Sequence, residues 1–353
     1  GTPAVVMDSV AQALTGVSSF DITGAGHFAV SADGALAWIR SPVVEYLDKA
    51  LVTVDRHGVI GRLPVEPRPY GPSVRLSPNG RRLVVTTRTS AASAVWVCDL
   101  ARGALTPALM DTEGTWPHWW AKDGRRLLID RNQHGQGTFV SVSFDGSGQP
   151  EELGPSARLW PSSFTPDGRR LVLVRDRGND VEDLVVTTVG DNLGRLETLV
   201  GAAEKPSNAE ISPDGRWLAY VSRRSGRSEV YVRPFRGSGG PVQVSVEGGD
   251  SPAWNPKGGE LFFPSTRTKD GTFWMMAASV SPVMEPGTPR RLFEFEAETL
   301  QFKCNPVRCY DVAPDGQSFY AVHGNMMAFP APVRHLNYMP HWIDDLKAKI
   351  PAR

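Results

Sequence analysis

The chain of 353 residues lacks several features that would assign it to a class at once. Charge of neither sign is in excess, because 38 Lys and Arg residues balance 38 Asp and Glu residues. This balance excludes bulk attraction to nucleic acid or to anionic membranes. No apolar run reaches the roughly 20 residues that span a bilayer as a helix. Residues 1–7 have no targeting signal and residue 1 is not Met, so we expect a processed chain or part of a longer reading frame.

Cysteine is also scarce, and three residues are too few for a disulfide scaffold. Cys304 and Cys309 are five residues apart, which allows either a local bridge in an oxidising compartment or two reduced thiols. Cys98 lies in an alternating apolar segment and is expected in the core. No pair of Cys or His residues has the spacing of a zinc site, so zinc is not expected.

Glycine and proline, by contrast, are plentiful, at 35 and 29 residues. Many of them recur in one motif, an apolar or aromatic residue followed by Ser or Thr, Pro, Asp and Gly, with variations. The motif occupies residues 30–34, 76–80, 120–124, 164–168, 211–215, 254–258 and 312–316. Successive motif glycines are 43 to 58 residues apart, a period typical of β-propeller blades.

Each copy of the motif predicts a β-hairpin. Pro sets the backbone φ at roughly −65°, Asp or Asn bonds to its own backbone, and Gly adopts the positive φ that a side chain disfavours. Alternating apolar strands follow, as at residues 82–86 and 217–221, and two further strands fit into each period. We therefore predict an all-β fold, a seven-bladed β-propeller of four-stranded blades, as a single domain over residues 1–353 with a short helical tail at 342–350.

The two ends of the chain are predicted to close the ring. The last copy supplies strands at residues 310–312 and 318–322 and a third at 335–338, which leaves one strand missing. Residues 3–7 can supply it, and pairing the first and last segments removes two sheet edges. A six-bladed propeller with a divergent end is the alternative.

The hairpin motif resembles the repeat of TolB-like, PD40-type (WD40-like) propellers. Residues 209–222 (Ala-Glu-Ile-Ser-Pro-Asp-Gly-Arg-Trp-Leu-Ala-Tyr-Val-Ser), 225–235 and 248–254 are similar to the C-terminal propeller of bacterial receptor serine/threonine kinases of the acidobacterial type. Residues 51–58, 310–316, 335–338 and 342–346 extend the likeness over almost the whole chain. The resemblance implies a sensor propeller outside the cytoplasm, following a kinase and a membrane segment.

Neither catalytic partner of such propellers is present in this sequence. It has no Gly-rich loop with a Val-Ala-x-Lys strand, no His-Arg-Asp and no Asp-Phe-Gly, so no kinase activity is implied. Related propellers also cover peptidases, but the Gly-x-Ser-x-Gly elbow is missing as well. The resemblance therefore implies a fold and a binding role rather than a reaction.

A propeller binds ligands at the mouth of its central channel, which is lined by the start of each innermost strand. Counting back from the motif glycines places aromatic, cationic and polar residues there. The predicted ligand-binding residues are Tyr70, Trp116, Trp160, Lys205, Asn208, Asp250 and Arg308. Aromatic walls with a few converging polar groups suit a small polar ligand, a sugar or a peptide end. Wedging of the aromatics between blades and mutual pairing of the charges is the structural alternative.

A divalent cation and catalysis are weaker hypotheses for the same mouth. Asn208, Glu210, Asp250 and Asp311 could offer four of the six to eight oxygens that Ca²⁺ takes. His118, Glu210 and Asp311 are the candidate catalytic residues. A histidine on an inner strand is more often a packed, hydrogen-bonded group, and no local spacing motif supports the calcium site.

The function that we predict is a monomeric ligand- or protein-binding sensor propeller without kinase activity, outside the cytoplasm or in the periplasm. Its partners would be a small molecule, peptide or protein at the channel mouth, and possible upstream kinase and membrane parts, with no nucleic acid. One alternative is a hydrolase of the esterase, lactonase or phosphotriesterase type, or a lyase, with or without a cation. The other is an interaction scaffold with no chemistry in the channel.

Overall fold

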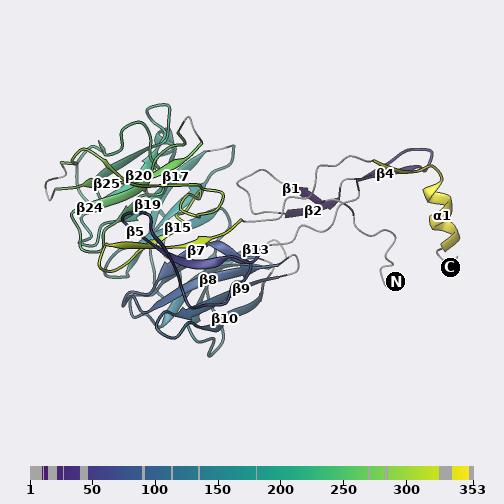
Figure 1. The fold of residues 1–353 in the computed structure, drawn as a ribbon, viewed down its shortest axis with the longest axis horizontal. Helices are drawn as coiled ribbons and strands as arrows, with labels where there is room; N and C mark the ends of the chain where they lie inside the picture. Colours follow the sequence, from purple (N-terminus) through teal and green to yellow (C-terminus); the bar gives the residue numbers. More distant parts are fainter. Residues whose placement is uncertain are drawn as a thin grey trace. The chain divides into compact units, whose positions relative to one another are not determined.

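The computed structural model describes residues 10, 12–14, 22–26, 28–39, 47–89, 92–112, 114–133, 136–179, 181–268, 271–281, 283, 285–325 and 336–349. The chain divides into two compact units. Unit 1 comprises residues 1–46 and 327–353, and unit 2 comprises residues 47–326. The elements of each are labelled in Figure 1.

Unit 2 is built from six four-stranded antiparallel sheets, here called blades 1 to 6. In order from the first strand to the fourth they are β7 (Tyr70–Leu76), β8 (Arg82–Arg88), β9 (Ser93–Asp99) and β10 (Ala104–Thr112); β11 (Gly114–Trp120), β12 (Arg126–Gln133), β13 (Gln136–Ser143) and β14 (Glu151–Pro155); β15 (Leu159–Phe164), β16 (Arg170–Asp176), β17 (Glu182–Thr188) and β18 (Glu197–Val200); β19 (Pro206–Ile211), β20 (Trp217–Ser222), β21 (Glu229–Pro234) and β22 (Val242–Gln243); β23 (Ala253–Trp254), β24 (Glu260–Pro264), β25 (Phe273–Ser279) and β26 (Arg290–Phe295); and β27 (Asp311–Val312), β28 (Ser318–His323), β5 (Ala50–Asp55) and β6 (Ile60–Arg62). The first strands of successive blades adjoin around a closed ring. The predicted all-β propeller is confirmed.

Six apolar clusters, one at each junction between neighbouring blades, form the core of the ring. Alternation along each strand explains how one blade serves two junctions, because successive side chains of a strand point to opposite faces. In β20, Leu218 and Tyr220 pack in the junction of blades 3 and 4, whereas Ala219 packs in the junction of blades 4 and 5. Flat sheets with both faces apolar thus stack into a ring.

Blade 6 closes the ring with strands from both ends of unit 2. The β5 strand pairs with β28, with Asp55 opposite Ser318 and Leu51 opposite Val322. The sequence instead predicts residues 335–338 and 3–7 in these places. The first segment is wrong, because β29 (Asn337–Met339) pairs with β4 (Leu36–Trp38) in unit 1; the second lies outside the described residues. The β5 strand is suited to the closure because it fills junctions on both of its faces.

Among the residues that the structure describes, six sheets have four strands, the number of the six-bladed alternative. The first copy of the motif, at residues 30–34, turns between β3 (Phe28–Val30) and β4 in a three-stranded sheet of unit 1. It forms no four-stranded blade, because the strands that follow it in sequence, β5 and β6, complete blade 6. Unit 1 also contains β1 (Gln12–Leu14) paired with β2 (Ile22–Gly26).

The predicted helical tail is confirmed as α1 (Trp342–Lys349), which packs on the sheet of unit 1. The Ile343 backbone N–H donates a hydrogen bond to the Gly34 carbonyl oxygen, and Figure 1 shows α1 at the C-terminal end of this unit. Among the residues that the structure describes, no helix has the length and apolar character needed to traverse a bilayer.

The hairpin turns have the geometry that the motif predicts. The motif glycines of blades 1 to 6 have φ between 65° and 78°. The Asp or Asn before the glycine accepts a backbone N–H bond from the residue after it, as in Arg169 N to Asp167 Oδ1 at 3.0 Å. The Thr165 hydroxyl donates to the same oxygen at 2.5 Å, and this bond lowers the pKa of Asp167. These local bonds explain why Ser or Thr and Asp recur at fixed positions.

Candidate functional site

The backbone of unit 2 is conformationally unusual on one face, here called the mouth face, where the first strand of each blade begins. Six described residues other than glycine have positive φ, and all six lie in segments on this face: Arg158, Asn179, Lys205, Asn208, Glu247 and Ser251. On the opposite face the glycines of the motif hairpins take that conformation, and on the mouth face glycines such as Gly178 and Gly248 take it beside these residues. A side chain makes positive φ unfavourable by roughly 1–2 kcal/mol, and such residues tend to concentrate at functional sites.

A buried ion-pair cluster lies inside the ring behind this face. Arg308, which is 7% exposed, contacts the Glu210 carboxylate at 2.6 Å and the Asp311 carboxylate at 3.1 Å. Burial lowers the pKa of Arg308, but the two carboxylates outweigh this effect and raise the pKa above its usual value. Burial raises the pKa of Glu210, with Arg308 acting in the opposite direction. Arg308 is therefore a permanent cation bridging blades 4 and 6.

The two carboxylates also join neighbouring blades through backbone bonds. Asp311 of blade 6 accepts the Leu76 N–H of blade 1 at 2.8 Å, and Glu210 of blade 4 accepts the Trp254 N–H of blade 5 at 2.8 Å. The Ser163 hydroxyl accepts the N–H of the next blade in the same way, at 3.0 Å. Asp311, Glu210 and Ser163 each lie five positions before the motif glycine of their own blade. Their role at that position is to fasten adjacent first strands together.

A second group on the mouth face centres on Asp250. The Asn208 amide donates to Asp250 Oδ1 and to the Cys304 carbonyl oxygen, both at 3.1 Å. Lys303 lies 3.5 Å from the other oxygen of Asp250. Cys304 and Cys309 form a disulfide with a Cα–Cα distance of 5.6 Å, which decides between the two possibilities that the sequence left open. The loop that carries Lys303 is thus held on the ring by a covalent bridge.

The other predicted ligand-binding residues occupy different environments. Tyr70 is fully buried in the junction of blades 6 and 1, where its hydroxyl donates to the Glu66 carbonyl oxygen at 2.9 Å. Trp160 is half-buried against the junction of blades 3 and 4. Lys205 is exposed, immediately after the 3-10 helix η1 (Ala202–Glu204). The side chains of Trp116 and His118 lie outside the described residues.

Arg75, on β7, is a further buried cation of the ring. It is 2% exposed, and its guanidinium stacks over the Trp119 ring at 5.0 Å from the centroid. Burial, followed by the charge of Arg308, lowers the pKa of Arg75 to about 10. Buried atoms without a hydrogen-bond partner among the described residues are Arg75 Nε, Trp119 Nε1, Arg308 Nε and Asn208 Oδ1. All four belong to residues that lie in a first strand or shortly before one.

The predicted calcium donors do not fit a cation. Arg308 lies between Glu210 and Asp311, and each carboxylate also accepts a backbone N–H bond from the neighbouring blade, at Glu210 on the same oxygen that Arg308 contacts. Asn208 turns its amide nitrogen, a donor, toward Asp250. In the part of the chain that the structure describes, no group of three or more His, Cys, Asp or Glu residues could hold a metal ion.

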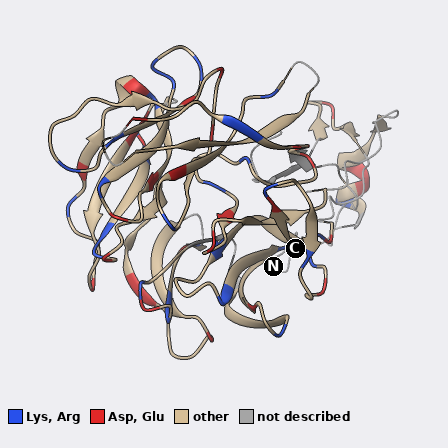
Figure 2. Ribbon diagram, turned by 60° about the vertical axis from the view of Figure 1, so that its left-hand side comes forward, with Lys and Arg blue, Asp and Glu red and all other residues tan. Residues whose placement is uncertain are grey.

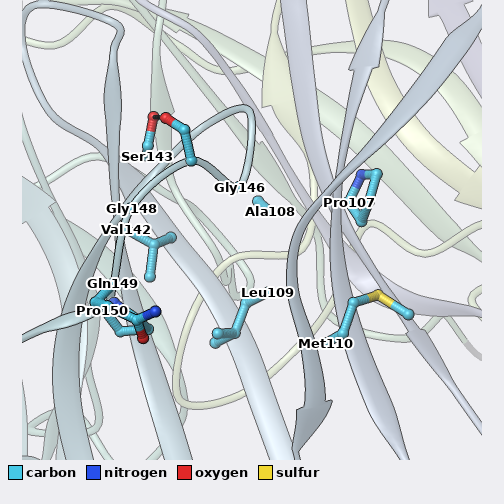
Figure 3. A pocket seen from close by; sticks show the side chains of 11 residues that line it. Pro107, Ala108, Leu109, Met110, Val142, Ser143, Gly146, Gly148, Gln149 and Pro150 are labelled. Carbon is cyan, nitrogen blue, oxygen red and sulfur yellow. Dashed lines mark hydrogen bonds between the residues drawn. The ribbon is translucent and has the colours of Figure 1, made fainter.

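Unit 2 also has a cleft on its outer strands. Figure 3 shows a cleft of about 270 Å³ between β10 of blade 1 and the turn before β14 of blade 2, far out on the ring. Its lining includes Leu109, Met110, Val142 and Pro150 and no titratable side chain. Figure 2 shows cationic and anionic residues interspersed over the strands and loops. The surface thus lacks the single-signed field that steers a charged macromolecule.

Comparisons with known proteins identify the fold. No protein-family model and no curated protein matches the chain. Among solved structures, a TolB candidate from Agrobacterium tumefaciens matches with a TM-score of 0.61 and 18% identity, over 82% of this chain and 100% of that one. TolB from Acinetobacter baumannii matches with a TM-score of 0.51 and 15% identity, over 82% and 67% of the respective chains. A candidate 6-phosphogluconolactonase from Bacteroides uniformis has a TM-score of 0.47 and 17% identity, over 88% and 96%. The fold is a TolB-like β-propeller.

Proposed function

We propose that this chain is a binding propeller that recognises a peptide or a small polar ligand on the mouth face of unit 2. The observation that carries the proposal is the gathering of all six described non-glycine residues with positive φ on that face. Glycine would adopt these conformations without strain, as it does on the opposite face. Side chains retained at a conformational cost are most simply explained by a function in which they take part.

Binding is favoured over hydrolysis by the state of the charged groups in the ring. Glu210 and Asp311 each hold Arg308 and a backbone N–H of the next blade, so neither carboxylate has the freedom of a general base. Among the described residues, no serine, threonine or cysteine side chain hydrogen-bonds to a histidine, the arrangement that activates a nucleophile. The described residues therefore support binding better than the hydrolase alternative.

On the mouth face, two cations and an aromatic ring lie on neighbouring blades and suit a ligand. Lys205 and Arg158 are exposed cations at the same position of neighbouring blades, and the half-buried Trp160 lies two residues beyond Arg158. A flat ring beside cations can contact both the apolar and the anionic parts of a peptide or a polar small molecule. Asp250 and Lys303 add a paired anion and cation on the adjoining blades.

An oxidising compartment is the proposed location. The Cys304–Cys309 disulfide is of a kind that persists outside the cytoplasm and is rare within it. This supports an extracytoplasmic protein, as the sequence resemblance implies. The link to an upstream kinase stays a prediction.

A matched pair of double variants tests the mouth face. A thermal-shift screen of the full chain would use defined acidic, basic and neutral peptides, hexoses, p-nitrophenyl acetate, gluconolactone and a phosphotriester. We expect one ligand class to raise the Tm of the wild type by mass action and to lose this effect in Trp160→Ala/Lys205→Glu. The control Trp217→Ala/Lys257→Glu, on the hairpin face, should retain it. Equal responses of both variants, or turnover of an ester, lactone or phosphotriester above background, would overturn the proposal.

A further inference from the structure

We propose that the channel of unit 2 contains a binding site for a singly charged anionic group of the carboxylate class, formed by Arg75, Trp119 and Arg308. This site lies inside the ring and goes beyond the mouth-face proposal, which does not depend on it. Arg75 is a buried cation whose hydrogen-bond partners are neutral. Arg75 Nε, Trp119 Nε1 and Arg308 Nε are buried donors without acceptors among the described residues.

Arg75 is a buried cation with neutral partners. Its Nη1 donates to the Val74 carbonyl oxygen at 2.7 Å and, over a longer distance of 3.4 Å, to the Tyr310 carbonyl oxygen. Its Nη2 donates to the Arg308 carbonyl oxygen at 2.5 Å. Within the described ranges, no carboxylate forms an ion pair with it, whereas Arg308, similarly buried, has two. Buried charges in proteins are normally paired or neutralised by a ligand.

Three donors without acceptors belong to adjoining side chains. They are Arg75 Nε, Trp119 Nε1 and Arg308 Nε. Arg75 links the other two, because it stacks on the Trp119 ring and bonds to the Arg308 carbonyl oxygen. Guanidinium and indole groups are donors only, so only an acceptor can satisfy them, and a buried donor without an acceptor destabilises the folded protein. Oxygens of an anion fit this requirement.

The neighbouring carboxylates set the preferred charge of the ligand. Glu210 and Asp311 share the channel with Arg75, and Arg308 already neutralises part of their charge. The remaining cation is Arg75, which is still protonated at neutral pH with its pKa of about 10. Arg75 and Arg308 together balance Glu210 and Asp311, so the group has no net charge, and a monoanion such as a carboxylate disturbs that balance less than a dianion such as sulfate does.

The test compares acetate with sulfate on the full chain. The Tm is followed by tryptophan fluorescence while acetate replaces sulfate at constant ionic strength. We expect acetate to raise the Tm in a saturable manner. Arg75→Gln should raise the apparent Kd for acetate at least about tenfold. The control Arg56→Gln should leave the response intact, since Arg56 stacks on Phe262 at 5.2 Å but already pairs with a carboxylate, that of Glu260.

A second variant covers the case in which Arg75→Gln does not fold. Trp119→Phe keeps an aromatic ring under Arg75 and opposite Phe164, which it meets edge-on, and removes the unpartnered N–H together with the larger indole system. It should weaken acetate binding several-fold. An acetate response identical in both variants and the wild type, a larger Tm rise with sulfate than with acetate, or no response to acetate would overturn the site.

Two further arms identify the source of the anionic group and separate this site from the mouth face. N-acetyl-diglycine and its C-terminal amide differ only in the carboxylate. A stronger effect of the acid than of acetate indicates a carboxylate that is part of a larger ligand, and an equal effect indicates a free small anion. The mouth-face variant Trp160→Ala/Lys205→Glu should retain the acetate response, so either proposal can fail without the other.

Discussion

Removing Arg308 is the perturbation that best tests how the ring is held together. In Arg308→Met, a side chain of similar length keeps the packing and the charge is lost. Glu210 and Asp311, which are 16% and 17% exposed, then remain as two anions without their cation. Breaking a buried ion pair by removing one partner destabilises a protein by about 3–5 kcal/mol. We expect a loss of this size in the free energy of unfolding at pH 7.5.

The loss should depend on pH in a defined direction. Burial already raises the pKa of Glu210 above its ordinary value of 4.5, and Arg308 is the main opposing influence. In the variant, the folded-state pKa of Glu210 therefore rises further above the unfolded value. A raised folded pKa contributes stability that is present below the unfolded pKa and is lost as the pH rises through the folded pKa. The variant should be closest to the wild type near pH 4 and fall behind it as the pH increases.

Urea unfolding of both proteins at pH 4.5 and 7.5, followed by tryptophan fluorescence, measures these differences. Arg131→Gln is the control, because its partner Glu152 lies at a similar distance, 3.0 Å, but is 67% exposed. Exposed pairs contribute up to about 1 kcal/mol. A loss in Arg308→Met no greater than in this control, or a loss independent of pH, would refute the role assigned to the cluster.

Three further outcomes follow from individual residues. Lys205→Gly should raise the free energy of unfolding by about 1 kcal/mol, since glycine adopts the φ of 45° without strain; an unchanged urea midpoint would contradict the strain. Reduction of the Cys304–Cys309 bridge should lower stability by about 2 kcal/mol, from the entropy of its short loop, and Cys304→Ser/Cys309→Ser should no longer respond to the reductant. Burial raises the pKa of Asp130 from 3.8 to about 6, so its contribution to stability is present below pH 4 and lost by pH 6. Asp130→Asn should remove that decline from a plot of stability against pH, and a decline that persists in the variant would assign it to another group.

Most of the fold could be predicted because the repeat acts locally. The turn of each hairpin depends on residues within five positions, so the sequence placed the motif glycines and the strands that follow them correctly. The number of blades could not be predicted from the motif, because it depends on which distant strands pair. The copy at residues 30–34 encodes a hairpin as the others do, yet it forms no four-stranded blade, because its following strand, β5, pairs with β28 more than 260 residues away. A hairpin motif says nothing about which distant strand completes its sheet.

The candidate site could be predicted in position more than in chemistry. Equivalent positions of the first strands lie at the same depth in a ring, so counting from the glycines gathered Glu210, Arg308 and Asp311 correctly. The same counting gave Tyr70 a ligand-binding role, although its ring fills the core between two blades. The surroundings of Arg75 could not be predicted, since the sequence does not show which carboxylate each arginine will reach.

The sequence by itself determined the repeat, the hairpin geometry and the all-β propeller class, because φ preferences and alternating apolar residues act over a few positions. Only the tertiary structure decided the closure of blade 6, the division into two units, the Cys304–Cys309 bridge and the pairing of charges in the ring. The closure, the division and the charge pairing depend on contacts between residues far apart in the sequence, and the bridge depends on how the loop between β26 and β27 folds back on the ring. The assignment of Arg308 to two carboxylates, and of Arg75 to none, is a consequence of how six blades meet around one channel.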